Sequence, residues 1–148
     1  MSFRMARRQE IERLQSEVEE LFADLWQLPH FLSARGFRPQ VDCYRSTKHS
    51  QFVVFVELAG VDPSKLTVAV DGRELVIAGE RRRDRGEGRV YQLMEIEDGP
   101  FERRIPLEPD VDVADGRARY RRGLLSIVFA LAKAPARPEQ VRIRVVTR

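Results

Sequence analysis

The chain has 148 residues, enough for one domain with appendages, because most domains contain about 100–150 residues. Charged residues make up 33% of it, above the usual quarter, which indicates heavily solvated faces. The 26 basic and 23 acidic side chains are interspersed and leave a net charge of +3. We therefore expect no nucleic-acid partner, since nucleic-acid modules concentrate cations on one face. The basic run at residues 81–85 has acidic neighbours, which favour a solvated loop over a phosphate site.

Cysteine content and hydropathy bear on the compartment. Cys43 is the only cysteine, so no intrachain disulfide can form, and a reducing cytoplasm is the expected location. Residues 1–28 carry charges every few positions, unlike the apolar core of a signal peptide. No run approaches the roughly 20 apolar residues of a membrane span, so no membrane partner is expected. Cys43 itself is predicted to be a packed strand residue, with a redox or crosslinking role as the alternative.

Residues 7–28 are predicted to form a helix. Their apolar residues recur in steps of three and four and so share one stripe, formed by Ile11, Leu14, Val18, Leu21, Leu25 and Leu28. Phe22 and Trp26 widen this stripe. Two interpretations stay open: the helix covers the neighbouring domain, or it is an arm that adheres to other chains. Pro29 ends the helix, and a linker punctuated by Gly and Pro runs on to Pro39.

From Val41 onward the pattern is that of short β-strands. Strands are expected over residues 41–44, 51–58, 66–70, 75–79, 90–96, 101–107, 118–120 and 125–131. No helical pattern separates them, which argues against a parallel α/β sheet and favours a sandwich. Gly123 is expected at positive φ in a tight turn, and Asp71-Gly72 is a hairpin signal. After a Pro-containing linker, residues 141–146 alternate apolar residues with arginine.

Motifs for enzymatic chemistry are absent from the sequence. It contains no His-Glu-x-x-His, no cysteine pair for zinc, no Gly-x-Ser-x-Gly and no Walker loop. His30 and His49 are the only histidines, and each is interpreted as a surface residue. We expect no catalytic residue, no metal site and no cofactor, and hence no enzyme.

The β region resembles the α-crystallin domain of the small heat-shock protein family from about Val41 to Lys133. The resemblance is carried, in order, by segments 55–61 (FVELAGV), 75–80 (LVIAGE), 99–107 (GPFERRIPL) and 118–125 (ARYRRGLL), and by Ile-x-Val at 143–145. Two departures stand out. The last strand runs about two residues past the family's usual Leu-Pro-Lys end, and Arg122 replaces the asparagine that often precedes the turn glycine.

The resemblance implies an all-β, immunoglobulin-like antiparallel β-sandwich with three parts. These are a partly helical arm (1–40), the sandwich (41–133) and a short extended tail (134–148). It also implies an ATP-independent holdase chaperone that works as a homo-oligomer of dimers and binds partly unfolded proteins. The candidate client-binding residues are Leu21, Phe22, Leu25, Trp26, Phe31 and Leu32. The alternative is a co-chaperone or adaptor module of similar fold that binds one defined partner.

By the same resemblance, two contacts between copies are expected. A loop strand pairs with the edge of a neighbouring subunit through Val90, Tyr91, Leu93, Met94 and Ile96, and is accepted there by Val41, Cys43 and Tyr44. The tail docks Ile143 and Val145 into a groove on another dimer, lined by Leu66, Val68, Val70, Ala118 and Tyr120. Independently of the resemblance, unpaired strand edges invite pairing with another chain.

Overall fold

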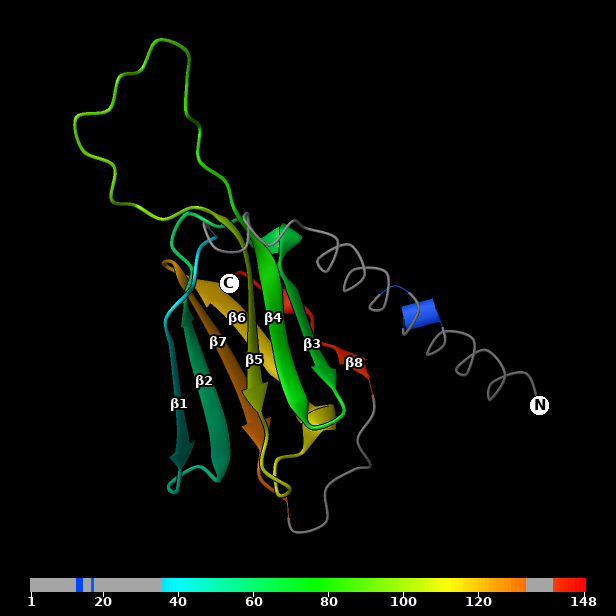
Figure 1. The fold of residues 1–148 in the computed structure, drawn as a ribbon. Helices are drawn as coiled ribbons and strands as arrows, with labels where there is room; N and C mark the ends of the chain where they lie inside the picture. The colour runs from blue at the N-terminus through cyan, green and yellow to red at the C-terminus, as the bar shows by residue number, and fades with distance from the viewer. Residues whose placement is uncertain (1–12, 15–16, 18–35, 133–139) are drawn as a thin grey trace.

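The computed structural model describes residues 13–14, 17, 36–132 and 140–148. Its strands form two layers (Figure 1). They are β1 (Val41–Ser46), β2 (Gln51–Glu57), β3 (Thr67–Asp71), β4 (Glu74–Arg81), β5 (Gly99–Pro106), β6 (Arg117–Arg121), β7 (Leu124–Ala130), β8 (Val141–Arg142) and β9 (Val145–Val146). Two single-turn 3₁₀ helices, Pro63–Lys65 and Val113–Asp115, lie between strands.

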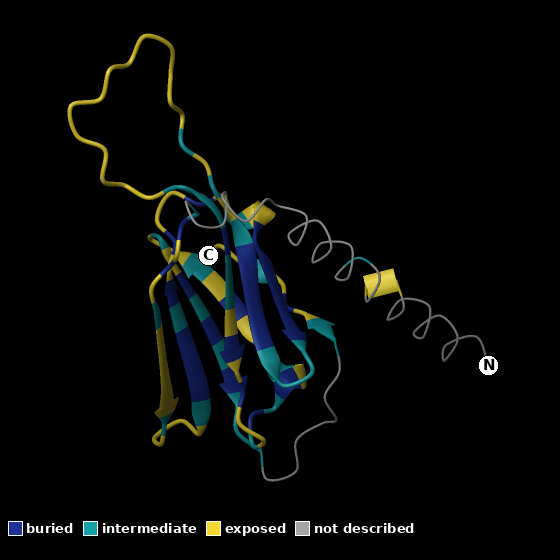
Figure 2. Cartoon of the chain, in the orientation of Figure 1, coloured by how far each residue is buried: buried dark blue, intermediate teal, exposed yellow. Residues whose placement is uncertain are grey.

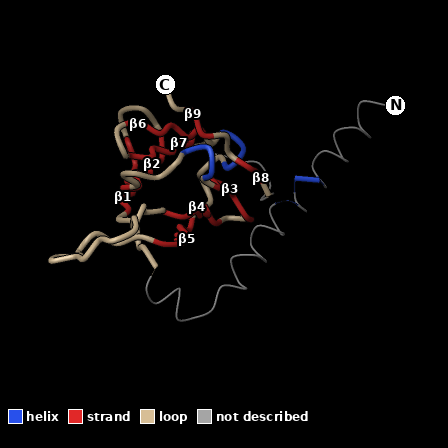
Figure 3. Tube along the Cα trace, turned by 90° about the horizontal axis from the view of Figure 1, so that it is seen from above, coloured by secondary structure: helices blue, strands red, loops and turns tan. Residues whose placement is uncertain are grey.

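One sheet has the order β1-β2-β7-β6-β9 and the other the order β5-β4-β3-β8. All pairings are antiparallel except β6 with β9. This confirms the antiparallel sandwich expected from the short, turn-punctuated strands. Seen from above, β1 and β5 lie at one side of the sandwich, and β8 lies at the other (Figure 3).

The core lies between the sheets, where alternate residues of each strand meet. Val54 and Val56 of β2 face inwards with Ile127 of β7, and Leu75 and Ile77 of β4 come from the opposite sheet; all five are 0% exposed. In Figure 2, β3 and β4 are dark along most of their length, whereas the burial pattern of β7 alternates with a period of two. Burying each such side chain is worth about 1.5–3 kcal/mol, so the alternation fixes which face of every strand points inwards.

The turn between β6 and β7 has the tight form that was predicted. Arg122 and Gly123 have φ angles of 54° and 81°, the combination of a two-residue type I′ hairpin. The Leu58 amide donates a 2.7 Å hydrogen bond to the Gly123 carbonyl. Arg122 therefore adopts the left-handed conformation that asparagine and glycine tolerate more easily.

The predicted strand over residues 90–96 is wrong for the single chain. Residues 82–98 form a long exposed loop between β4 and β5, which projects from the body (Figure 1). A strand needs a ladder partner for its backbone groups, and none is supplied to this segment by the described part of the same chain. Its alternating apolar residues are therefore left in solvent.

Most of the predicted helix over residues 7–28 lies outside the described residues, although Arg13, Leu14 and Glu17 are helical. All six candidate client-binding residues also lie outside them. The linker contributes one residue that the sequence did not assign to the core. Phe37 is 6% exposed and packs edge-to-face on Phe101, with ring centroids 5.6 Å apart.

Candidate functional site

The C-terminal tail fills one side of the sandwich. β8 extends the β3 sheet, with Val70 opposite Val141, and β9 runs parallel to β6, with Ala118 opposite Val145. Between them the Ile143 amide donates a 2.7 Å hydrogen bond to the Val68 carbonyl. The tail thus bridges the two sheets and closes the gap between β3 and β6.

Ile143 is the residue that enters this gap. It is 5% exposed and belongs to the core cluster together with Leu66, Val68, Val70 and Ala118. Tyr120 packs at the margin and donates a 2.9 Å hydrogen bond from its hydroxyl to the Leu58 carbonyl. The tail residues and the groove residues named from the sequence therefore lie together, but within one chain. Docking into another dimer stays a prediction.

Gly116 makes room for this contact, and sequence reasoning did not single it out. A Cβ atom at Gly116 would lie 2.7 Å from the Cδ1 atom of Ile143 and 2.6 Å from the Cε1 atom of Phe129. Its φ of −68° is ordinary, so the constraint is space rather than backbone conformation. The sequence signal available was only a glycine just before a predicted strand.

On the opposite side of the sandwich, between β1 and β5, no segment of the described chain covers the gap between the sheets. β1 is the edge of its sheet, and its four central residues are all exposed. Tyr44 is 48% exposed and stacks on Phe55, with centroids 6.1 Å apart. This edge offers free backbone groups to another strand.

Two reactive or charged groups lie on the inward side of this open edge. Cys43 is opposite the core residue Val54, and burial raises the pKa of its thiol, partly offset by the positive charge of Arg103. Arg103 of β5 donates a 2.7 Å hydrogen bond to the Pro39 carbonyl. Desolvation, and then repulsion from Arg38, lowers the pKa of Arg103. Cys43 is exposed, which corrects its predicted role as a packed residue: at an edge strand no neighbouring strand covers it.

The loop holds its apolar side chains in solvent. Val90 is 98% exposed, Leu93 71% and Ile96 64%, and Met94 and Tyr91 are also exposed. Large apolar side chains gathered on one segment mark an interaction site, since a monomeric protein seldom leaves such a group uncovered. These are the residues named from the sequence for exchange.

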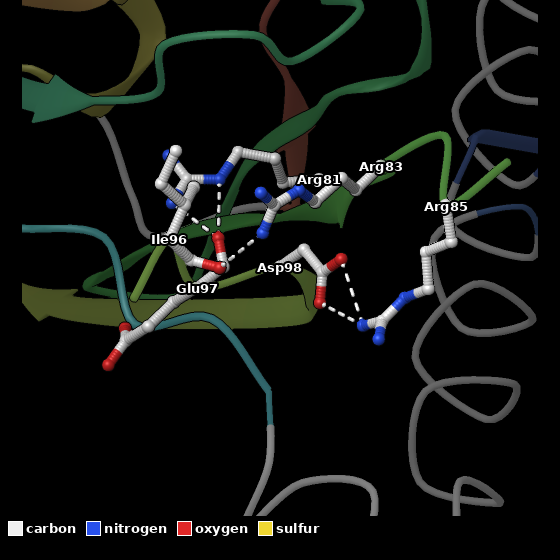
Figure 4. A network of polar contacts seen from close by, with 6 residues as sticks. All are labelled: Arg81, Arg83, Arg85, Ile96, Glu97 and Asp98. Atoms are coloured by element: carbon white, nitrogen blue, oxygen red, sulfur yellow. Dashed lines mark hydrogen bonds and ion pairs between the residues drawn. The ribbon is translucent and has the colours of Figure 1, made fainter. Parts of the chain in front are cut away.

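Three arginines secure the base of the loop (Figure 4). Arg81 donates from Nε and a terminal nitrogen to the Glu97 carbonyl, at 2.9 and 2.5 Å, and Arg83 donates to the Ile96 carbonyl at 3.2 Å. Arg85 contacts both carboxylate oxygens of Asp98, at 2.9 and 3.1 Å. The basic run of residues 81–85 therefore holds the two ends of the loop together.

The described part of the helical arm lies near the tail. Glu17 is 3.8 Å from the Arg142 guanidinium, and Leu14 lines the same hollow as Leu66 and Ile143. Among the residues that the structure describes, no group of three or more His, Cys, Asp or Glu side chains is placed to hold a metal ion. The same residues include no helix with the length and hydropathy required to cross a membrane.

Comparison with known proteins decides the family. Residues 45–146 match the profile of the Hsp20/alpha crystallin family, a range that takes in both the loop and the tail. The chain belongs to this family. It is therefore a small heat-shock protein, and its two-sheet body is an α-crystallin domain.

Relatives within the family cover different shares of the chain. A 19.0 kDa class II heat shock protein of Oryza sativa subsp. japonica is 40% identical over 98 residues, 62% of this chain and 55% of that protein. The chain thus spans just over half of this relative's length. The Alpha-crystallin of Mycobacterium tuberculosis is 30% identical over 135 residues, covering 86% of this chain and 87% of its own.

Solved structures agree on the fold. The hspA of Xanthomonas axonopodis superposes with a TM-score of 0.59 at 32% identity, covering 65% of this chain and 95% of that one. A small heat-shock protein from Xylella fastidiosa, described as having a distinct high order structure, gives a TM-score of 0.59 at 29% identity, with coverages of 71% and 94%.

Proposed function

We propose that this small heat-shock protein is an ATP-independent holdase, which captures partly unfolded proteins and works as an oligomer of dimers. One observation carries the proposal: the same molecule has both a loop whose apolar side chains are exposed to solvent and a sheet edge that no other strand covers. Non-covalent capture needs only apolar surface that can be exposed and covered again. Family membership supports the same function.

The dimer is proposed to form by strand exchange. The apolar run of the loop leaves the body on the side of β1, and β1 carries unpaired backbone groups along an exposed edge. Pairing would satisfy both at once, since each needs a ladder partner. Burying Leu93 and Ile96 would each add about 1.5–3 kcal/mol.

The larger assembly is proposed to form when the tail leaves its own groove and enters that of another dimer. The groove and tail are complementary within one chain, so an identical groove on a second copy presents the same contacts. Two buried aliphatic side chains, less the cost of ordering the tail, bind weakly one at a time. Many tails in one assembly add through effective concentration, so each contact can open while the whole persists.

Client capture is assigned to the arm, through Leu21, Phe22, Leu25, Trp26, Phe31 and Leu32. Apolar side chains on one stripe can repack against many partners, which suits low specificity. The absence of catalytic and phosphate-binding motifs from the sequence is consistent with a function that needs no nucleotide.

The test is suppression of heat-induced turbidity of an aggregation-prone protein, without nucleotide, with the assembly mass measured in parallel. We expect suppression by a large or polydisperse oligomer. A variant with Phe22→Ser and Trp26→Ser should keep the assembly mass and lose suppression, whereas Arg13→Gln on the same arm is the matched control. A monomer that leaves turbidity unchanged but binds one defined partner would overturn the proposal in favour of an adaptor.

A further inference from the structure

The outer face of β6 gathers arginines into a row. Arg117, Arg119 and Arg121 alternate with the inward-facing Ala118 and Tyr120, so the three arginines share the outer face, and all three are exposed. Along an extended strand, successive arginines of this row are about 6.6 Å apart. The expectation of no nucleic-acid partner assumes that the cations stay interspersed, whereas the period of two collects these three on one face.

This row has little opposite charge beside it. Residues 117–122 contain four arginines and no acid, a charge of +4, whereas the whole chain has a net charge of only +3. Within the described part of the chain, Asp115 is 3.5 Å from Arg117 in a contact open to solvent, and neither Arg119 nor Arg121 has a carboxylate partner. Such a row attracts a linear polyanion, because one chain can place a phosphate at each cation.

The described strands of this sheet carry two acids on the outer face, and both are distant from the row. Arg121 lies opposite Leu124 of β7, which lies opposite Glu57 of β2, so Glu57 is two strand spacings, about 10 Å, from Arg121. Its carboxylate accepts a hydrogen bond from the Ala59 amide. Asp42 lies one strand further away, on β1. At physiological salt, charges more than about 8 Å apart are largely screened, so these acids do not cancel the row.

An aromatic pair lies on the same outer face. Phe55 of β2 is opposite Ser126 of β7, and Ser126 is opposite Arg119, so Phe55 shares their face two strand spacings from the arginine. Tyr44 of β1 stacks on Phe55, with ring centroids 6.1 Å apart, and is 48% exposed. Aromatic side chains on an open sheet stack unpaired bases, while cations beside them hold the phosphate backbone.

We propose that the outer face of the β1-β2-β7-β6 sheet binds single-stranded nucleic acid, with phosphates on the arginine row and a base on Tyr44 and Phe55. This binding goes beyond the proposed chaperone function. It does not depend on strand exchange, which extends the sheet at its β1 edge and leaves this face open. A duplex keeps its bases paired and stacked, so it cannot use the aromatic pair. Inorganic polyphosphate and an anionic lipid surface would use the arginines alone.

The first test measures binding to the full chain by fluorescence anisotropy. The probes are fluorescein-labelled oligouridine and oligothymidine of about 16 nucleotides, which distinguish RNA from DNA, and binding of either supports the proposal. Three phosphate contacts predict that log Kd rises with the logarithm of the salt concentration with a slope of about 2, since each contact on a single strand contributes about 0.7. No binding of either probe at about 50 mM salt would overturn the proposal.

Variants of the row test its place on the sheet. Arg119→Gln with Arg121→Gln should weaken binding at least about tenfold and lower the salt slope by about 1.4. Arg82→Gln with Arg89→Gln is the matched control, because it removes the same two charges from the exposed loop between β4 and β5. The control should keep the parent slope. An equal loss in both double variants would show that binding follows net charge, and would overturn the assignment to this face.

Variants of Tyr44 test the stacked base and remain informative if the arginine variants fail to fold, which circular dichroism would detect. Tyr44→Leu should weaken binding of the oligonucleotide at least about fivefold, whereas Tyr44→Phe keeps a ring and should retain the affinity. Neither change should alter the affinity for inorganic polyphosphate, which has no bases. Equal affinities of the Leu and Phe variants for the oligonucleotide would overturn the stacking contact.

Competition separates the other occupants. A duplex that binds as tightly as the single strand would overturn the proposal, because the face would then read the phosphates alone. Inorganic polyphosphate that binds as tightly as the oligonucleotide at equal phosphate concentration would overturn it for the same reason. Vesicles containing phosphatidylserine that bind the chain when neither oligonucleotide does would assign the row to a membrane surface instead.

Discussion

The two sides of the sandwich differ in whether the chain itself covers the gap between the two sheets. The β3/β6 side is closed by the chain's own tail, with Ile143 5% exposed in the gap. The β1/β5 side keeps an exposed edge strand, the thiol of Cys43 and the guanidinium of Arg103, which donates to a backbone carbonyl. One side is complete within a single chain, whereas the other is completed only by a second copy under our proposal.

The difference follows from where the C-terminal tail and the loop between β4 and β5 are joined to the body. The tail follows β7 through residues 131–140, and its anchor lies in the groove of its own chain. The loop joins neighbouring strands β4 and β5, and Arg81, Arg83 and Arg85 hold its two ends together. The loop with its apolar run projects from the body, as Figure 1 shows, and under our proposal it pairs with another molecule.

The largest effect on assembly is expected from removing the tail side chains that fill the gap between β3 and β6. Ile143→Ala together with Val145→Ala removes both tail anchors, and truncating a well-buried isoleucine alone typically costs about 2–5 kcal/mol. We expect the assembly mass in light scattering to fall towards that of the dimer. An unchanged assembly mass would show that the tail does not hold dimers together. Val146→Ala, at a residue that is 48% exposed, is the matched control.

A smaller effect is expected from filling the space beside the anchor. Gly116→Ala places a Cβ atom 2.7 Å from the Cδ1 atom of Ile143, and overpacking of this kind costs about 1–3 kcal/mol. The tail should dock less often, so the Ile143 amide should exchange its hydrogen about tenfold faster or more. Adding Ile143→Val removes the clashing Cδ1 atom and should restore part of the protection. No restoration would mean that Phe129 moves instead.

On the open side, the reactivity of Cys43 reports the local charge. Burial raises the pKa of the thiol and Arg103 lowers it, so the midpoint of the alkylation rate against pH should lie above that of the unfolded chain. Arg103→Gln removes the lowering charge and should move the midpoint higher still. The measurement uses the Leu93→Asp background, which leaves β1 uncovered. Arg117→Gln, on β6, should not move it; a midpoint insensitive to Arg103 would contradict the geometry of this edge.

The smallest effect concerns an exposed ion pair at the end of β1. Both terminal nitrogens of Arg45 donate to Asp110, at 2.7 and 2.6 Å, and this hydrogen bonding lowers the pKa of Asp110. A lowered folded-state pKa stabilises above the unfolded value of about 4, and the contribution is lost as the pH falls through the folded value. Arg45→Gln should therefore lower the melting temperature slightly at pH 7 and not at about pH 2. Arg119→Gln serves as the control, and an equal loss at both pH values would exclude the carboxylate as its cause.

Much of the fold was predictable because its causes are local. The period of two along the last long strand puts Leu125, Ile127 and Phe129 on one face, and all three are core residues. The positive φ of Gly123 followed from the need for a tight turn before the last long strand. The groove residues could be named only through the resemblance to the family, because β3 and β6 are remote in sequence.

What the sequence by itself determined was which segments favour an extended strand and which faces are apolar, since these depend on neighbours two or three residues apart. Only the tertiary structure decided that the tail lies in its own groove, that Gly116 makes room for it, that Phe37 joins the core, and that residues 90–96 stay unpaired. It also placed Arg103 on the inward face beside Cys43. These outcomes depend on distances between remote segments and on competition for a limited space, which no local pattern encodes.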